Sequence, residues 1–279
     1  MALSIASLNS GSNGNCYYVG NDREAILVDA GLSARETDTR LKRLGLIPTK
    51  VKAIFITHEH GDHIKGLRSV IKKYKVPVYI TTNTHQQCRL RIKEQYLRTF
   101  NAFEPIRIGS LSVTAFPKIH DACDPHSFIV SCDSINVGVF TDIGSACKNV
   151  VHHFKQCHAA FLESNYDEEM LDKGSYPYAL KNRIRGGKGH LSNRQALQLF
   201  LEHKPSFMSH LLLSHLSENN NRPDIVQNLF NRCAANTEIA IAPRYEESQV
   251  YYIDSTARYA VRPIRHKIVK HQFQLSLFQ

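Results

Sequence analysis

The sequence lacks any run of about eighteen apolar residues, the length that a membrane-spanning helix needs. Its first residues, Met1 to Asn9, also lack the positively charged start and apolar core of a secretory signal peptide. These two absences argue against a membrane protein and against a secreted one. The sequence therefore predicts a cytoplasmic protein with no membrane partner.

Paired cysteines are also missing. The seven cysteines form an odd number, are scattered from Cys16 to Cys233, and include no C-x-x-C motif. This distribution argues against a disulfide framework and against a zinc site built from thiolates. We expect the cysteines to be reduced and mostly buried.

Acidic residues are the minority among the charged ones. Lys and Arg number 35 against 25 Asp and Glu, which gives a formal net charge of +10. This balance favours an anionic partner, with nucleic acid ahead of a membrane surface. A chain of 279 residues can form one large α/β domain. We expect a catalytic domain over residues 1–255 and a separate tail over 256–279.

The stretch 54–66, IFITHEHGDHIKG, carries the main metal-binding signal. Imidazole and carboxylate groups together suit a divalent cation such as Zn²⁺, and also Mn²⁺ or Fe²⁺. His58 and His60 point the same way in an extended segment, because side chains there repeat with period two. Asp62 and His63 stand where a helical pattern begins, so they can face a second metal. The alternative is a helix cap beside surface histidines.

The H-x-H-x-D-H pattern of residues 58–63 resembles the signature of metallo-β-lactamase fold hydrolases. Further landmarks of that family occur in the expected order, in the strings VDAG, FPKIHD, VGVFTDIG and LLLSHL. The resemblance implies an α/β (α+β) fold, a four-layer αββα sandwich, with two divalent metal ions, Zn²⁺ or Mn²⁺, between the β-layers. It assigns His58, His60 and His120 to one metal, Asp62, His63 and His215 to the other, Asp142 as the bridge, and Asp29 as a support that orients ligands without touching metal.

Longer strings narrow the resemblance to one branch of the superfamily. SGSNGN at 10–15, IHDA at 119–122, and AAFLESNYD, YPYALKNRIR and GGKGHLSN between residues 159 and 193 look like the YycJ or WalJ branch of bacterial DNA exonucleases. The resemblance covers about residues 1–253. It implies metal-dependent hydrolysis of single- or double-stranded DNA, with 5′-to-3′ polarity and a link to repair or replication.

Two segments are candidates for substrate binding. The glycine-rich loop 10–15 can expose backbone N–H groups to a phosphate or form an ordinary turn, and the resemblance favours the site. Residues 181–194 contain five basic residues and no acid, which predicts a phosphate-binding stripe, with a solvated loop as the alternative. The candidate substrate-binding residues are Ser10, Ser12, Asn13, Asn165, Lys181, Arg183, Arg185, Lys188 and Ser192, and Arg194 completes the basic stripe.

His190 is the candidate proton donor. It follows three glycines in five positions and precedes a helix expected from Arg194 to His203. It can protonate the leaving oxygen or contact a phosphate, and the alternative is a histidine packed on a helix start. With His190, we predict that Asp62 is catalytic, as the residue that orients the attacking oxygen.

Elsewhere, apolar periodicity predicts alternating strands and helices. A polar helix is expected over 84–97, where Arg89, Arg91, Lys93 and Arg98 track a phosphate backbone or, as the favoured alternative, face solvent. A helix at 224–235 and strands at 238–242 and 249–253 are expected to complete the second half of the fold. The other predicted strands are 3–8, 16–19, 25–28, 76–81, 106–108, 111–116, 128–132 and 135–140, and a further helix is expected over about 33–44.

The last residues change in character. Residues 256–279 contain five Lys or Arg and no acid, and they end in HQFQLSLFQ. Gln274, Leu275, Leu277 and Phe278 resemble the peptide by which bacterial DNA enzymes dock on the sliding clamp. An incidental match or a last β-strand is the alternative.

Two other functions remain open. One is an RNA-processing or small-phosphodiester hydrolase of the same fold. The other is a catalytically silent module that binds nucleic acid or the clamp, although the presence of every candidate ligand argues against it. A lactamase or thioesterase would favour a neutral groove over a basic one.

Overall fold

Side chains of the early strands alternate between two separate cores. In β3 (Ala25–Val28), Ile26 and Val28 belong to one buried cluster, whereas Ala25 and Leu27 belong to another. All four side chains are fully buried, so the strand is covered on both faces. A sheet built from such strands needs a covering layer on each of its faces.

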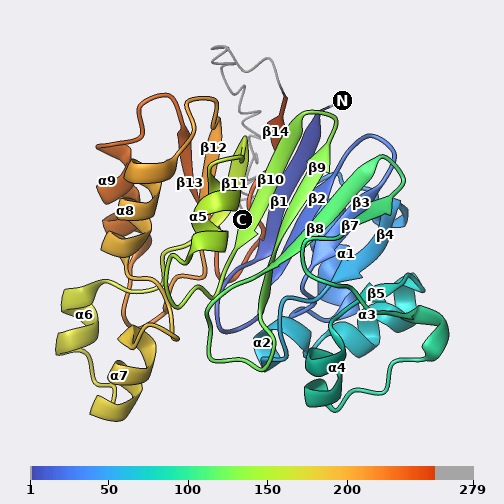
Figure 1. Cartoon of the computed structure of the whole chain (residues 1–279), viewed down its shortest axis with the longest axis horizontal. Helices are drawn as coiled ribbons and strands as arrows, with labels where there is room; N and C mark the ends of the chain where they lie inside the picture. Colours follow the sequence, from blue (N-terminus) through green and yellow to red (C-terminus); the bar gives the residue numbers. More distant parts are fainter. Residues whose placement is uncertain (1, 255–279) are drawn as a thin grey trace, which may run out of the picture.

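The computed structural model describes residues 2–254 and has this arrangement (Figure 1). One seven-stranded sheet has the order β14-β1-β2-β3-β4-β5-β6, and a second has the order β13-β12-β11-β10-β9-β8-β7. The first contains β1 (Leu3–Asn9), β2 (Cys16–Gly20), β4 (Val51–Phe55), β5 (Val78–Tyr79), β6 (Leu97–Arg98) and β14 (Tyr251–Ile253). The second contains β7 (Pro105–Ile108), β8 (Leu111–Pro117), β9 (His126–Cys132), β10 (Ile135–Phe140), β11 (Ala159–Glu163), β12 (His210–Ser214) and β13 (Glu238–Ile241).

Three apolar clusters hold four layers together. The central one lies between the sheets and includes Phe55 from β4 and Phe128 from β9, whose ring centroids are 5.5 Å apart. The outer clusters pack α1 (Ala34–Arg43) and α3 (Leu67–Tyr74) on the first sheet, and α5 (Lys148–Phe154), α8 (Asn193–His203) and α9 (Pro223–Asn231) on the second. The predicted four-layer αββα sandwich is confirmed (Figure 1).

The prediction for the last strand is wrong. It was expected to complete the second half, but β14 pairs antiparallel with β1, with Leu3 opposite Ile253. Ile253 is fully buried in the central cluster between the sheets. The order of strands along a chain does not determine which sheet edge the last one joins.

The helix predicted over 84–97 is also wrong. The helix α4 (Thr82–Cys88) ends at Arg89, whose φ is +51°, and a loop then leads to a short 3₁₀ turn, η2 (Glu94–Tyr96). Leu90 and Ile92 alternate along this loop and pack against the outer core of the first sheet. That alternation favours an extended segment over a helix.

Three short helices were not predicted, of which α5 is one. The other two are α6 (Glu168–Lys173) and α7 (Tyr178–Arg185), which lie together below the second sheet (Figure 1). In the described part of the chain, no helix has the length and apolar character to cross a membrane. Residues 255–279, which include the predicted tail and the clamp-binding peptide, lie outside the described residues.

Candidate metal centre

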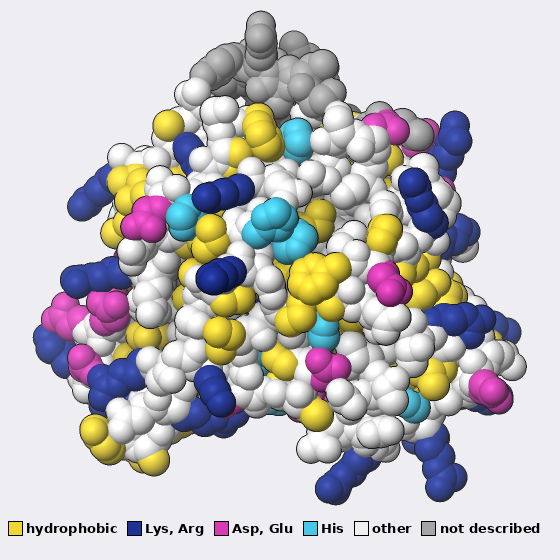
Figure 2. Space-filling model, viewed as in Figure 1, with side chains coloured by type: hydrophobic (Ala, Val, Ile, Leu, Met, Phe, Trp, Pro, Cys, Tyr) yellow, Lys and Arg dark blue, Asp and Glu magenta, His cyan; other side chains and the backbone are white. Residues whose placement is uncertain are grey.

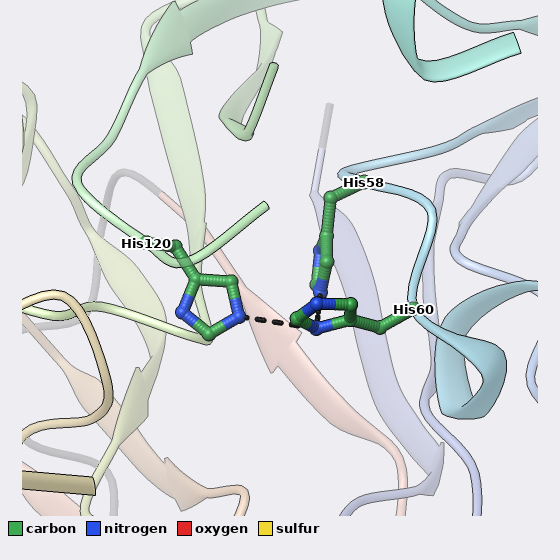
Figure 3. A group of neighbouring side chains, drawn as sticks. All are labelled: His58, His60 and His120. Carbon is green, nitrogen blue, oxygen red and sulfur yellow. Dashed lines mark hydrogen bonds between the residues drawn. The ribbon is translucent and has the colours of Figure 1, made fainter. Parts of the chain in front are cut away.

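Three histidine nitrogens converge at the end of β4. Nε2 of His58 is 3.0 Å from Nδ1 of His60, which is 3.3 Å from Nε2 of His120. Figure 3 shows the three rings turned toward one another, two from the loop after β4 and one from the loop after β8. Metal–nitrogen bonds of 2.0–2.1 Å at tetrahedral angles place the nitrogens about 3.3 Å apart. The spacing therefore fits one cation.

A second group lies beside the first. Asp62 and His63 belong to α2 (Gly61–Ile64), and His215 directly follows β12. Oδ2 of Asp62 is 3.4 Å from Nε2 of His63 and 3.5 Å from Nε2 of His215. One carboxylate and two imidazoles thus offer a set of ligand atoms for a second cation.

Asp142 lies between the two groups. Its Oδ2 is 3.1 Å from Nε2 of His63, and its Oδ1 is 3.8 Å from Nε2 of His120. Within residues 2–254, neither Oδ2 of Asp142 nor Nε2 of His215 has a hydrogen-bond partner, although both atoms are buried. An unsatisfied buried polar group is costly, and a coordinated cation would satisfy it. These residues therefore fit two divalent cations with Asp142 between them.

Other hydrogen bonds orient the rings. Nδ1 of His63 donates to Oδ2 of Asp29 at 2.7 Å, and Nδ1 of His120 donates to the Gly189 carbonyl at 3.0 Å. Asp29 also accepts from the backbone N–H of Thr57 at 2.8 Å. The bonds from His63 and His120 hold these two rings in the tautomer that leaves Nε2 for a cation.

The backbone is unusual at three of these positions. Asp29, Asp142 and His215 have φ values of +64°, +54° and +57°. Each follows the end of a strand, and left-handed backbone is uncommon for residues other than glycine. It costs roughly 1–2 kcal/mol per residue and persists where the surroundings enforce it, typically at functional sites.

The electrostatics of the two groups differ. Burial lowers the pKa of His120 to about 4, which keeps its imidazole neutral, as a ligand must be. Burial also opposes protonation of His215, but the Asp142, Asp62 and Glu163 carboxylates raise its pKa to about 10. Burial raises the pKa of Asp62, but His63 and His215 hold it below its ordinary range. Loading a cation into the second group would therefore release protons.

Glu163 is a site residue that sequence reasoning missed. It ends β11, is fully buried, and accepts hydrogen bonds from the backbone N–H groups of Ile143 and Leu191 at 2.7 and 3.1 Å. Burial raises the pKa of its carboxyl, but the charge of His190 and the hydrogen bonds from His190 and His215 together lower the pKa to about 2. One signal in the sequence could have identified Glu163. It directly follows the apolar run AAFL, and other site residues also directly follow apolar strands.

The metal groups open into a cleft of about 410 Å³. The predicted substrate residues Ser12, Asn165 and Arg183 line it, together with His190. Ser10 is 1% exposed and lies behind the site, where its Oγ accepts from the backbone N–H of His215 at 2.7 Å.

Two other predicted substrate residues make structural contacts. Ser192 caps α8: its Oγ accepts from the Gln195 backbone N–H at 3.1 Å and donates to Glu168 at 2.9 Å. Asn13 donates from Nδ2 to the Arg244 carbonyl at 2.8 Å. Asn13 therefore positions a neighbour that faces the cleft.

The basic stripe is largely paired with acids from other segments. The guanidinium groups of Arg183 and Arg185 lie 2.6 Å from carboxylate oxygens of Asp121 and Asp172, and that of Arg194 lies 3.2 Å from Glu168. Lys181 donates to the Asp172 carbonyl at 2.7 Å, and Lys188 is exposed. The positive charge expected from residues 181–194 alone is therefore larger than the unpaired charge that the stripe has in the folded protein.

Arg244 is a second residue that the sequence did not single out. It lines the cleft, donates to Oγ of Ser12 at 3.2 Å, and donates to the Leu216 carbonyl. A Cβ on Gly11 would lie 2.9 Å from the guanidinium carbon of Arg244, so glycine allows this close approach. Within residues 2–254 Arg244 forms no ion pair, and its charge is available to an anion.

Known proteins resemble this chain in sequence and in fold. Residues 10–133 match the profile of the metallo-beta-lactamase superfamily. The chain is 34% identical over 230 residues to exodeoxyribonuclease YycJ of Bacillus anthracis, covering 81% of this chain and 87% of that protein. It is 30% identical over 219 residues to exodeoxyribonuclease WalJ of Streptococcus pneumoniae, covering 77% and 81%. The solved metallo-beta-lactamase fold protein YhfI from Bacillus subtilis superimposes with a TM-score of 0.69 at 16% identity, covering 90% of this chain and 100% of that one.

Proposed function

This chain belongs to the metallo-β-lactamase superfamily and, within it, to the family of the YycJ and WalJ proteins, and from that membership we propose that it is a metal-dependent DNA exonuclease. One observation carries the proposal: a complete set of converging imidazole and carboxylate ligands lines an open cleft in a chain whose relatives are named exodeoxyribonucleases. The reaction is hydrolysis of phosphodiester bonds from a 5′ end, in DNA repair or replication.

The ligand roles follow from the convergence of the side chains. His58, His60 and His120 would hold one cation, Asp62, His63 and His215 the other, and Asp142 would contact both. Two divalent cations, Zn²⁺ or Mn²⁺, supply acidification of water and neutralisation of charge on the phosphoryl oxygens. Asp62 orients the attacking oxygen. Its own carboxylate is held by Nδ2 of Asn15 at 3.0 Å.

His190 is the proton donor to the leaving oxygen. Its Nδ1 donates to Glu163 at 2.7 Å, which leaves Nε2 for an oxygen in the cleft that His190 lines. The buried Glu163 carboxylate fixes the orientation of the ring through this hydrogen bond. Support for this role comes from geometry, since the ring is 22% exposed and sits beside the metal groups.

The cleft also supports binding of a phosphate and a nucleoside. Arg244 and Ser12 line it and can contact a phosphate, and Arg183 lines it while paired with Asp121. Tyr176 and Leu180 supply apolar surface next to these charges. This combination suits a terminal nucleotide better than a neutral ester.

The decisive experiment is digestion of end-labelled nucleic acids by metal-stripped protein to which Mn²⁺, Zn²⁺ or Mg²⁺ is returned. Single- and double-stranded DNA and RNA of one sequence are compared, with His60→Ala as the matched control. We expect mononucleotides released from the 5′ end of DNA and none from the control. Preferential hydrolysis of RNA, or hydrolysis of small phosphodiesters alone, would show that DNA is not the substrate. No hydrolysis with any metal would refute the proposal.

Recruitment to the sliding clamp is a separate part of the proposal. It rests on Gln274, Leu275, Leu277 and Phe278, which lie outside the described residues. A short peptide that buries two or three apolar side chains should bind at about micromolar strength. A peptide of residues 271–279 should bind a bacterial sliding clamp at the ionic strength of the cytoplasm. The double substitution Leu277→Ala with Phe278→Ala should abolish this binding. Absence of binding between this peptide and the clamp at about 100 µM would refute the proposed recruitment.

A further inference from the structure

A second basic groove lies outside the metal cleft. It has a volume of about 480 Å³ and separates α3 from the loop that follows α4. Arg68, Lys72 and Lys75 line the α3 wall, and Arg91 and Lys93 line the opposite wall. All five side chains belong to exposed residues. We call this surface the α3 groove.

The helical repeat explains the α3 wall. Leu67, Val70 and Ile71 face the core, so residues 68 and 72 fall on the solvated flank of the helix, beside Leu67 and Ile71. Lys75 follows as the left-handed residue that ends α3. The other wall depends on the end of α4. After Arg89 the chain is extended, so successive side chains point to opposite sides. Leu90 and Ile92 are partly buried, whereas Arg91 and Lys93 are exposed to solvent.

These cations differ from those of the basic stripe in one decisive respect. Within residues 2–254, none of the five forms an ion pair, whereas Arg183, Arg185 and Arg194 each contact a carboxylate. Lys73, their neighbour on α3, is paired with Asp38 at 3.0 Å and does not line the groove. Five unpaired like charges around one groove repel one another, and an anionic polymer would relieve that repulsion.

The floor of the groove indicates which polymer. It is apolar and consists of Leu67, Ile71, Leu90, Ile92 and the ring of Tyr96. Single-stranded nucleic acid combines a charged backbone with bases that pack on aromatic and apolar surface, whereas a duplex keeps its base faces stacked inside. Charge and floor together favour an unpaired strand.

The position of the groove relates it to the metal centre. Asp62 and His63 lie in α2, and α3 begins at Leu67, only a few residues later. The eight residues of α3 rise about 12 Å, so its cations extend away from the metal loop. Figure 1 draws α4 at the lower edge of the molecule with α3 above it, and Figure 2 shows Lys and Arg side chains projecting from that lower edge.

We infer that the α3 groove binds single-stranded DNA outside the catalytic cleft. The inference rests on the proposed function in that the bound strand is the part of the substrate beyond the bond being cleaved. The cations contact phosphates, and Tyr96 packs against a base. The groove would keep the enzyme on its substrate between successive cleavages.

Binding of single-stranded DNA in the presence of a chelator tests the inference without hydrolysis. The test variant is Arg68→Glu with Lys72→Glu in the full chain. The matched control is Lys50→Glu with Lys52→Glu, which changes the formal charge equally. Lys50 and Lys52 also form no ion pair within residues 2–254, and they lie at the end of β4 remote from the metal loop. Melting temperatures of both variants check that the fold is retained.

We expect the groove variant to bind roughly tenfold or more weakly at about 0.1 M salt, with a log-log salt slope smaller by about 1.4, since each lost contact to a single strand contributes about 0.7. The control should bind as wild type does. Equal weakening of both variants, or an unchanged slope in the groove variant, would overturn the inference. The inference would also be overturned if the groove variant bound duplex DNA more weakly than wild type but bound single-stranded DNA equally well.

Photo-crosslinking provides an independent measurement. A strand carrying 5-iodouracil should crosslink to Tyr96, and an excess of unlabelled single strand should suppress the product. Absence of a Tyr96 crosslink while DNA is bound would contradict placement of a base on this ring. Because these assays contain no metal, groove-dependent binding without later metal-dependent hydrolysis would refute the proposed function alone.

Discussion

Oε1 of Glu163 accepts a hydrogen bond from Nδ1 of His190 at 2.7 Å, and the same oxygen lies 3.0 Å from Nδ1 of His215. One buried carboxylate thus contacts both the proposed proton donor and a proposed metal ligand. Substituting the carboxylate should disturb proton transfer and metal affinity together. Removing His190 should disturb proton transfer alone.

His190→Ala should lower the maximal rate of DNA hydrolysis by roughly 10² to 10⁴, because a positioned general acid contributes about that factor. Metal content, measured by elemental analysis, should stay at the wild-type value. A substrate with a good leaving group needs less protonation, so its hydrolysis should be much less affected. An unchanged rate on DNA would mean that His190 only packs on the start of α8.

Glu163→Gln is the companion variant. It should lower metal affinity by about 10- to 100-fold as well as the rate, since loss of a carboxylate that orients a metal-binding histidine has effects of this size. Titration with Mn²⁺ or Zn²⁺ measures the affinity. Wild-type affinity in this variant would show that His215 does not depend on Glu163.

Four of the candidate ligands were predictable because they form a strong local pattern. His58, His60, Asp62 and His63 stand within six residues after an apolar strand, and few structures other than a metal site need that density. Asp142 and His215 were placed by a resemblance between strings. Their left-handed backbone, which fits the site, leaves no mark in the sequence.

Contacts between distant segments were not predictable. The acids that neutralise the basic stripe come from residues 121, 168 and 172. Pairing of β14 with β1 joins the two ends of the described chain, and no local pattern encodes it. The α3 groove forms because α4 ends early, which brings Arg91 and Lys93 opposite α3.

Gly66→Ala should destabilise the protein. A Cβ at this position would lie 1.7 Å from the Leu32 carbonyl oxygen, where backbone approaches backbone, so two segments must move apart. Overpacking of this kind costs roughly 1–3 kcal/mol. Denaturant unfolding measures the loss of unfolding free energy.

Gly61→Ala is the matched control on the same segment. No described atom lies within 4 Å of a Cβ at Gly61, and alanine favours a helix over glycine by about 1 kcal/mol. This variant should be as stable as wild type or slightly more stable. Equal destabilisation by both substitutions would show that contact with Leu32 is not the cause.

Thiol reagents should distinguish the cysteines by burial. Cys123 is exposed, whereas Cys16 and Cys157 are fully buried, and burial raises the pKa of both buried thiols far above the ordinary range. Because the thiolate reacts, Cys123 should be labelled first in the native protein, and Cys16 and Cys157 only after unfolding. Peptide mapping after brief labelling gives the order, with Cys123→Ser as the control. Rapid labelling of Cys157 in the native state would contradict its placement in the core.

Metal binding should stabilise the folded protein. Asp142 and His215 present buried atoms without hydrogen-bond partners among residues 2–254, and coordination satisfies them. A ligand that binds only the folded state adds about 2.7 kcal/mol at a hundredfold excess over its dissociation constant. For a chain of this size, each kcal/mol raises the melting temperature by about 2–4 °C. Returning Mn²⁺ or Zn²⁺ to metal-stripped protein should therefore raise the melting temperature by about 5–10 °C.

Two alanine variants locate the origin of that stabilisation. His60→Ala removes a nitrogen that lies 3.0 Å from His58 and 3.3 Å from His120, so the metal-dependent rise should shrink. His152→Ala removes an exposed histidine of α5 outside the metal groups and should leave the rise intact. Scanning calorimetry of the stripped and loaded forms gives all four values. An equal rise in both variants would place the stabilising cation elsewhere, because only one of them has lost a proposed ligand.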